Sequence, residues 1–256
     1  MSYEKYSPSG FGFLPPVVKN LIIINGLFFL ATIVLENSMR IDLSDYLGLH
    51  YFVSPHFAPY QFVTYMFMHG NFSHIFFNMF ALWMFGSVLE QTWGPKKFLT
   101  YYMITGIGAG LIQVLVIFIQ VYYAEVGLTA DQIAQVRETG YEILKNGQNY
   151  SDPLLGNLNA LYNMTTIGAS GSVFGLLLAF GMLFPNSLIY LYFFIPIKAK
   201  WFVILYGAIE LFSGVYNTGS NIAHFAHLGG MIFGFFLIIY WKKKADKHRN
   251  NNYWQQ

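Results

Sequence analysis

Residues 21–35, LIIINGLFFLATIVL, contain no charged side chain and lie between Lys19 and Glu36. A helix of about 20 apolar residues crosses the hydrocarbon core of a bilayer, so this stretch predicts a transmembrane helix. The whole chain has the same character: of its 256 residues, 55% are hydrophobic and only 10% are charged. A soluble domain carries about 25% charged residues. We therefore predict a polytopic membrane protein rather than a soluble enzyme or a disordered chain.

Other charge-free stretches give the positions of the remaining spans. The stretches between Asp45 and Glu90 and between Asp152 and Lys198 are too long for one helix, and each contains prolines. We predict an all-α bundle of six spans, at residues 21–35, about 74–89, 97–125, about 168–183, 201–215 and 223–241. The predicted organisation is an N-terminal tail (1–16), a six-span domain (17–241) and a basic tail (242–256).

The basic residues predict the orientation of these spans. If the N-terminus is cytoplasmic, 11 of the 14 Lys and Arg residues lie inside, and only Arg40, Arg137 and Lys145 lie outside. This is the distribution that the positive-inside rule requires. Both termini are then expected in the cytoplasm. We expect no cleavable signal, because Pro15 and Pro16 precede the first apolar segment and no small-residue cleavage site is evident.

Two predicted outside segments are long. The first, about residues 37–68, is rich in aromatic side chains and nearly uncharged, which favours a position in the membrane interface. The second contains LTADQIAQVRETGYEILKNG, which predicts an external amphipathic helix at about 128–147. Thr129 and Gln132 have the spacing of a capping box. The apolar face of this helix is predicted to consist of Ile133, Val136, Tyr141 and Leu144.

Three polar clusters fall at the outer ends of predicted spans. They are HGNFSHIFFN (69–78), GASGSVFG (168–175) and NIAHFAHLGG (221–230). Polar groups inside a bilayer are costly and commonly mark function. Because all three lie at the same predicted depth, we expect them to form one site. The chain has no cysteine, which excludes thiolate nucleophiles, disulfides and cysteine-ligated metals.

Ser170 and His227 are the candidates for nucleophilic chemistry. A serine needs a base to accept its proton, and histidine is suited to that role at neutral pH. His74 and Asn78 are four residues apart, share a helix face, and could donate hydrogen bonds to an oxyanion. Phe174, one turn after Ser170, could stack on the imidazole and hold its plane.

Close helix packing would bring this serine and histidine together. Gly171 and Gly175 are expected to face Gly230 and Gly234, which lets the two helices approach. No Asp or Glu is expected near either motif, because Glu210 is predicted nearer the middle of its span. These considerations favour a Ser–His dyad over a triad.

The motifs resemble those of the rhomboid family of intramembrane serine proteases, of the bacterial six-helix type. GASG is similar to the family's G-x-S-G, AHLGG to its sixth-helix motif, and HGNFSHIFFN to its second-helix motif. GSVLEQTWG, with Gly86, Glu90 and Gly94, resembles a further element with a structural role. The resemblance covers residues 59–234. This chain has Tyr60-Gln61 where many rhomboids carry Trp-Arg, and Phe174 where bacterial relatives often have Tyr.

The resemblance implies a function and roles for the site residues. Ser170 would be the nucleophile and His227, rather than His224, the general base. His74, Asn78 and the Ser170 backbone N–H would form the oxyanion hole, supported by Phe174 and by Gly168, Gly171 and His69. The implied substrates are single-pass transmembrane proteins in the lipid bilayer, entering beside the fifth span past a cap at 217–223. Neither a cofactor nor nucleic acid is implied. The implied location is the bacterial plasma membrane, with the site on the extracytoplasmic side.

Other readings of the sequence remain open. His69, His74, His224 and His227 could ligate a metal, although HExxH is absent and no carboxylate is expected nearby. A transporter or channel could use the histidines and Glu210 as a proton relay. A non-catalytic relative could bind membrane segments, although such relatives usually lose the serine or the histidine.

Overall fold

The computed structural model describes residues 14–191, 194–216 and 223–253. Within that part of the chain, five helices are long and apolar enough to cross a membrane: Pro16–Met39, Phe72–Trp93, Pro95–Glu125, Ala199–Tyr216 and His224–Lys247. Each coincides with a predicted span. The chain is a multi-pass membrane protein built mainly of helices. Most of the N-terminal tail (1–13) lies outside the described residues, as does most of the predicted cap (217–222).

The described helices follow one another along the chain as α1 (Pro16–Met39), α2 (Ser44–Leu47), α3 (Gln61–Thr64), α4 (Phe72–Ala81), α5 (Ser87–Trp93), α6 (Pro95–Glu125), α7 (Ala130–Lys145), α8 (Pro153–Tyr162), α9 (Ser170–Leu183), α10 (Ala199–Tyr216) and α11 (His224–Tyr253). A 3₁₀ turn, η1 (Tyr65–Phe67), precedes α4, and a π-helical segment, η2 (Leu82–Gly86), joins α4 to α5. Two short antiparallel pairs, β1 (Leu49–His50) with β2 (Thr165–Thr166) and β3 (Leu188–Leu191) with β4 (Ile195–Lys198), were not anticipated.

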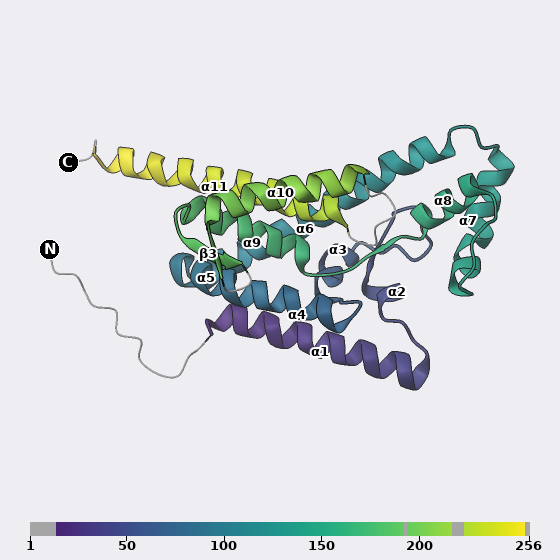
Figure 1. The fold of residues 1–256 in the computed structure, drawn as a ribbon, viewed down its shortest axis with the longest axis horizontal. Helices are drawn as coiled ribbons and strands as arrows, with labels where there is room; N and C mark the ends of the chain where they lie inside the picture. The colour runs from purple at the N-terminus through teal and green to yellow at the C-terminus, as the bar shows by residue number, and fades with distance from the viewer. Residues whose placement is uncertain (1–13, 192–193, 217–222, 254–256) are drawn as a thin grey trace.

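Helix α9 lies at the centre of the bundle. It packs against α6, α10 and α11, while α1 and α4 lie on the side of the bundle opposite α10 and α11 (Figure 1). Its 14 residues extend about 21 Å at 1.5 Å per residue, less than the hydrocarbon thickness of about 30 Å. A short central helix can end inside the bundle. Its first residue, Ser170, is half-buried.

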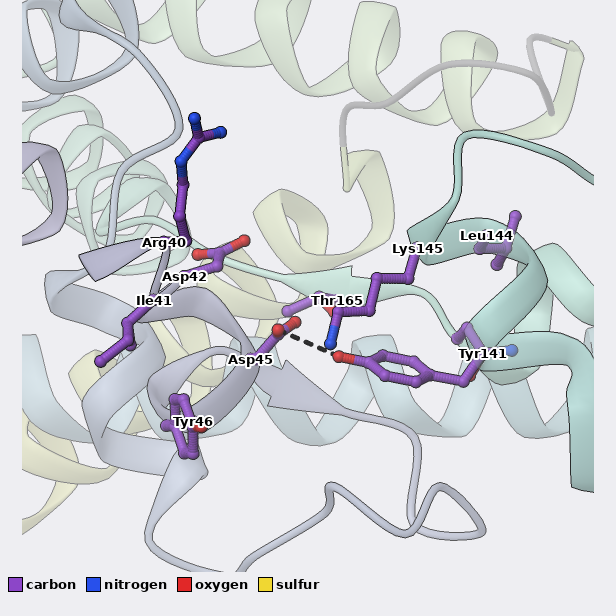
Figure 2. Close-up of a pocket in the computed structure, with 10 residues that line it drawn as sticks. Arg40, Ile41, Asp42, Asp45, Tyr46, Tyr141, Leu144, Lys145 and Thr165 are labelled. Atoms are coloured by element: carbon purple, nitrogen blue, oxygen red, sulfur yellow. Dashed lines mark hydrogen bonds between the residues drawn. The ribbon is translucent and has the colours of Figure 1, made fainter. Parts of the chain in front are cut away.

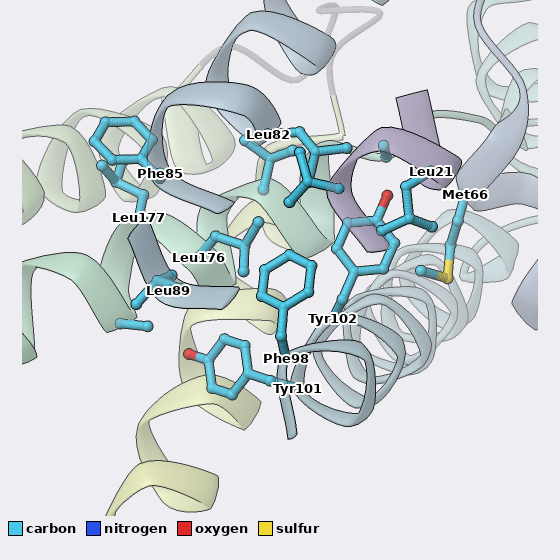
Figure 3. Close-up of a cluster of buried hydrophobic side chains, with 14 of the residues drawn as sticks. Leu21, Met66, Leu82, Phe85, Leu89, Phe98, Tyr101, Tyr102, Leu176 and Leu177 are labelled. Atoms are coloured by element: carbon cyan, nitrogen blue, oxygen red, sulfur yellow. The ribbon is translucent and has the colours of Figure 1, made fainter. Parts of the chain in front are cut away.

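The main hydrophobic core lies between α1, α6, α9 and the η2–α5 segment. Figure 3 shows its aromatic side chains, Phe98, Tyr101 and Tyr102, which are fully buried beside Leu82 and Leu176. The opposite faces of the outer helices carry exposed Leu, Ile and Phe side chains, as lipid-facing surfaces do.

The glycine contacts confirm one predicted pair and correct the other. Gly171 and Gly230 touch backbone to backbone, with an ideal Cβ at Gly230 lying 2.8 Å from the Gly171 carbonyl carbon. Gly175 and Gly234 do not face each other. Both face α6 instead: a Cβ at Gly175 would lie 2.7 Å from Thr105 Cβ, and one at Gly234 would overlap the Tyr101 hydroxyl.

The reason for the correction is a tyrosine between the two helices. Tyr101 on α6 donates a hydrogen bond of 2.8 Å to the Gly175 carbonyl oxygen. The space left by Gly175 and Gly234 is therefore occupied by α6, whereas α9 and α11 are in backbone contact at Gly171 and Gly230, next to Ser170.

The predicted amphipathic helix is present as α7 (Ala130–Lys145). Thr129 and Gln132 form the predicted capping box, and Val136 is fully buried. Its apolar face packs on α6 and on α8, a helix that was not predicted. Arg137 donates to the Tyr162 hydroxyl at 3.0 Å and forms an ion pair of 3.2 Å with Glu125. The helix therefore covers protein.

Gln61 organises the segment between α1 and α4. It is fully buried, and its amide donates to the carbonyl oxygens of Tyr46 (3.1 Å) and His56 (2.8 Å). Its own carbonyl accepts from the backbone N–H groups of Ala58 (3.1 Å) and His50 (3.3 Å). A neutral side chain thus ties this segment together, and α2, α3 and β1, none of which was predicted, form around it.

Glu90 caps the start of α1. Its carboxylate oxygens accept hydrogen bonds from the backbone N–H groups of Val17 (3.0 Å) and Val18 (2.8 Å), and the side chain is 3% exposed. The first N–H groups of a helix have no partner inside it, and negative charge there is favourable. The motif Gly86–Glu90–Gly94 therefore joins α5 to α1, which supports its predicted structural role.

We expect Glu90→Gln to lower the free energy of unfolding by about 1–3 kcal/mol, because a glutamine oxygen can replace only one of two charge-assisted bonds. The measurement is the midpoint of thermal unfolding in detergent. Glu36→Gln, at the exposed other end of α1, is the matched control and is expected to leave the midpoint unchanged. Equal midpoints for both variants would contradict the capping role.

Candidate active site

Ser170 is the first residue of α9. The chain enters the helix through Gly168, whose φ of 123° is reached readily only by glycine, and whose N–H donates to the Tyr65 carbonyl oxygen at 2.8 Å. The Ser170 N–H belongs to the first turn of α9 and has no acceptor inside the helix. The Ser170 hydroxyl and an N–H without an acceptor in its own helix are therefore held at the positive end of α9.

His227 lies in the first turn of α11 and faces Ser170. Its Nε2 is 2.8 Å from Ser170 Oγ, and its ring stacks on Phe174 at 4.1 Å between centroids, with 6° between the planes. The Phe174 ring stacks in turn on Tyr206 of α10, at 5.2 Å. The predicted proximity of Ser170 and His227 and the predicted stacking of Phe174 are both present.

His74 approaches the same serine from α4. An ideal Cβ built on Gly168 would lie 2.7 Å from His74 Nε2 and 3.6 Å from Ser170 Oγ, so the imidazole and the hydroxyl both lie close to this glycine. His74 Nδ1 is 3.4 Å from the Gly70 N–H, which can only donate. In the neutral ring the proton is then on Nε2, and the group directed at the site is a donor.

The other residues that were predicted to belong to the site lie near His74 and Ser170, and each makes a different kind of contact. Asn78 is buried, but its amide donates to the His74 carbonyl oxygen at 2.9 Å, one turn back on its own helix. His69 packs edge-on against His74, with ring centroids 4.9 Å apart. Burial, and to a smaller extent His74, lowers the pKa of His69 to about 4, so this ring is neutral at neutral pH. Gly171 provides the contact with Gly230.

Glu210 corrects the prediction that no carboxylate lies near the motifs. Its Oε2 is 2.8 Å from His227 Nδ1 and 2.7 Å from His224 Nδ1, and the side chain is buried. The sequence contains a signal that could have placed it. Gly207, Glu210 and Gly214 share one face of α10, and a Cβ at Gly214 would lie 3.1 Å from the ring of Phe225 on α11. Small residues at this spacing mark the face that packs on a neighbouring helix.

The set of possible metal ligands also differs from the predicted one. Among the described residues, Glu210, His224 and His227 each offer one ligand atom, and these atoms lie within 4.8 Å of one another. The predicted set of four histidines included His69 and His74 but no carboxylate. Nδ1 of each of these two imidazoles is already hydrogen-bonded to Glu210.

A separate hollow lies between the segment that follows α1 and helix α7. Its volume is about 420 Å³, and it is lined by residues 40–42, 45 and 46 and by α7 residues such as Tyr141 and Lys145 (Figure 2). The Tyr141 hydroxyl donates to Asp45 at 3.0 Å across it. Burial and Asp45 raise the pKa of Tyr141 to about 12, so it remains a donor. None of the predicted catalytic residues lines this hollow.

Together these features define a class: a helical membrane protein with a half-buried serine at the start of a helix, paired with a histidine from a neighbouring helix. A family model for the Rhomboid domain matches residues 56–244. The chain belongs to the rhomboid family.

Individual relatives are distant. The chain is 26% identical over 183 residues to "Rhomboid protein 1, mitochondrial" of Saccharomyces cerevisiae, which covers 72% of this chain and 42% of that protein. It is 27% identical over 168 residues to "RHOMBOID-like protein 12, mitochondrial" of Arabidopsis thaliana, covering 66% and 42%. With "Rhomboid protease AarA" of Providencia stuartii, it shares 26% over 184 residues, covering 68% and 53%. The chain thus spans less than half of the two mitochondrial relatives.

Proposed function

We propose that this protein is an intramembrane serine endopeptidase that hydrolyses peptide bonds in or near the transmembrane segments of single-pass membrane proteins. Ser170 is the nucleophile and His227 the general base. His74, Asn78 and the Ser170 N–H stabilise the oxyanion. Membership of the rhomboid family favours this function over transport.

One observation carries the proposal: Ser170 Oγ lies 2.8 Å from His227 Nε2, inside a bundle where no other base is within reach of that hydroxyl among the described hydrogen bonds. A serine hydroxyl is a weak nucleophile until a base accepts its proton. The ring of Phe174 holds the imidazole plane. Little reorganisation is then needed when a peptide bond arrives.

The reaction follows from these positions. Ser170 Oγ attacks the carbonyl carbon while its proton passes to His227 Nε2, and negative charge develops on the former carbonyl oxygen. The Ser170 N–H and His74 Nε2 are the donors best placed for that oxygen. The intermediate collapses as His227 protonates the leaving amine. Water then hydrolyses the acyl-enzyme, with His227 again acting as base.

Asn78 contributes after a small adjustment. Its amide has two hydrogens, and the hydrogen bond to the His74 carbonyl uses one of them. The second hydrogen is available to the oxyanion when a substrate is bound. Catalytic hydrogen bonds are often long or misaligned before the substrate arrives.

We further propose six crossings with both termini in the cytoplasm. Helix α1 begins and the described part of α11 ends at the same end of the molecule, which requires an even number of crossings (Figure 1). Five long helices together with the short α9 make six. The distribution of Lys and Arg then puts Ser170 on the extracytoplasmic side. The protease domain is residues 17–241, with tails at 1–16 and 242–256, in a bacterial plasma membrane.

The test is covalent labelling of the detergent-solubilised protein with a fluorophosphonate, which reacts with activated serines. We expect stoichiometric labelling of the wild type, no labelling of Ser170→Ala, and no effect of EDTA. Ser172→Ala is the matched control, because Ser172 donates to the Tyr102 carbonyl oxygen on α6 and not to His227. Labelling of Ser170→Ala at the wild-type rate would refute the assignment, and loss of labelling in EDTA would favour a metal-dependent site.

A further inference from the structure

One carboxylate oxygen of Glu210 is hydrogen-bonded to two imidazoles. Its Oε2 is 2.7 Å from His224 Nδ1 and 2.8 Å from His227 Nδ1. The carboxylate comes from α10, and both histidines come from the first turn of α11. Glu210 is 6% exposed and His227 is 8% exposed, so water competes little for these contacts.

This arrangement decides which nitrogen of His227 carries the proton. An ionised carboxylate can only accept hydrogen bonds, so His227 Nδ1 must donate. In a neutral imidazole the other nitrogen, Nε2, then has a lone pair. That lone pair faces Ser170 Oγ at 2.8 Å, as a general base requires.

The stacking of Phe174 cannot make this choice. Parallel rings fix the plane of the imidazole, but a stacked ring can carry its proton on either nitrogen. Only the hydrogen bond to Glu210 distinguishes the two tautomers. The same negative charge also stabilises the imidazolium that forms when His227 takes the serine proton.

We propose that Glu210 is a positioning residue that completes a Ser170–His227–Glu210 triad. It holds His227 in the Nδ1–H tautomer, and His224 is the second donor that keeps the carboxylate in place. This inference rests on the proposed protease function and replaces the dyad predicted from the sequence. Glu210 does not itself accept the proton, which remains on His227 until the leaving amine takes it.

The test compares Glu210→Gln, Glu210→Asp and the exposed Glu36→Gln on cleavage of a transmembrane substrate in detergent. We expect Glu210→Gln to lower kcat by about 10²- to 10⁴-fold, as loss of the orienting acid does in other serine proteases. KM is expected to stay within about threefold, because Glu210 touches no substrate. Glu210→Asp keeps the charge and is expected to retain more activity than Glu210→Gln. Glu36→Gln is expected to match the wild type.

A spectroscopic measurement separates positioning from folding. In ¹⁵N-histidine-labelled wild type, we expect His227 to show a protonated Nδ1 and an unprotonated Nε2, and in Glu210→Gln a mixture of both tautomers. His224→Gln leaves the contact of Glu210 with His227 intact and is expected to cost less than about tenfold in kcat.

The outcomes distinguish this inference from the proposed function. If Glu210→Gln keeps kcat within about threefold while Ser170→Ala is inactive, Glu210 has no positioning role and the protease assignment stands. Equal losses in the Gln and Asp variants would also overturn the inference, because charge would not matter. If the wild type neither cleaves substrate nor reacts with fluorophosphonate, the proposed function itself fails.

Discussion

Replacing His227 by alanine is expected to lower kcat for peptide-bond hydrolysis on the order of 10⁵-fold, because the serine then has no base. The described structure offers no substitute: His224 is bonded to Glu210, and His74 presents an Nε2–H to the site rather than a lone pair. The measurement is cleavage of a transmembrane substrate under saturating conditions.

His224→Ala is the matched control, since it removes the other histidine of the same helix turn without touching Ser170. Its loss is expected to remain below about tenfold. The double variant Ser170→Ala/His227→Ala is expected to be no worse than either single variant, because members of a catalytic unit are strongly non-additive. A larger loss for His224→Ala than for His227→Ala would mean that the base had been assigned to the wrong histidine.

Those features of the fold that depend on local chemistry could be predicted from the sequence. The spans follow from charge-free stretches, and α7 follows from the capping box of Thr129 and Gln132. The Ser170–His227 contact was predictable because glycines on both helices permit close approach, and Gly171 with Gly230 provides it. In each case the sequence pattern lies within one segment, or in two motifs that are predicted to lie at the same depth in the membrane.

The features that were missed depend on which helix faces which. Gly171 and Gly175 are four residues apart, as are Gly230 and Gly234, so the sequence predicts two matching contacts. Gly175 nevertheless faces α6, because the Tyr101 hydroxyl donates a hydrogen bond to its carbonyl oxygen. Glu210 was predicted to lie away from the site because only its depth in the membrane was considered. The face of α10 that Glu210 shares with Gly207 and Gly214 was not considered, although it points toward α11. Which helices of an apolar bundle pack against each other depends on such side-chain contacts. These contacts involve two helices, so they cannot be read from the sequence of one.

The second large effect is expected at Gly230. In the wild type its Cα lies against the Gly171 carbonyl, where a Cβ would overlap the carbonyl oxygen and lie 2.8 Å from its carbon. Both of these atoms are backbone, so no side-chain rotation relieves the clash. Gly230→Ala must therefore push α9 and α11 apart, and this separation lengthens the distance between Ser170 and His227.

A displacement of about 1 Å at reacting groups can cost about 10²-fold in rate. We expect Gly230→Ala to slow fluorophosphonate labelling of Ser170 by at least about this factor and to lower the midpoint of thermal unfolding. Gly26→Ala is the control, because a Cβ there meets nothing within 4 Å, and it is expected to retain full labelling. The intrinsic preference for alanine in helices, about 1 kcal/mol, acts equally in both variants. Any difference between them therefore measures the contact between α9 and α11, and unchanged labelling in Gly230→Ala would show that this contact does not set the Ser170–His227 geometry.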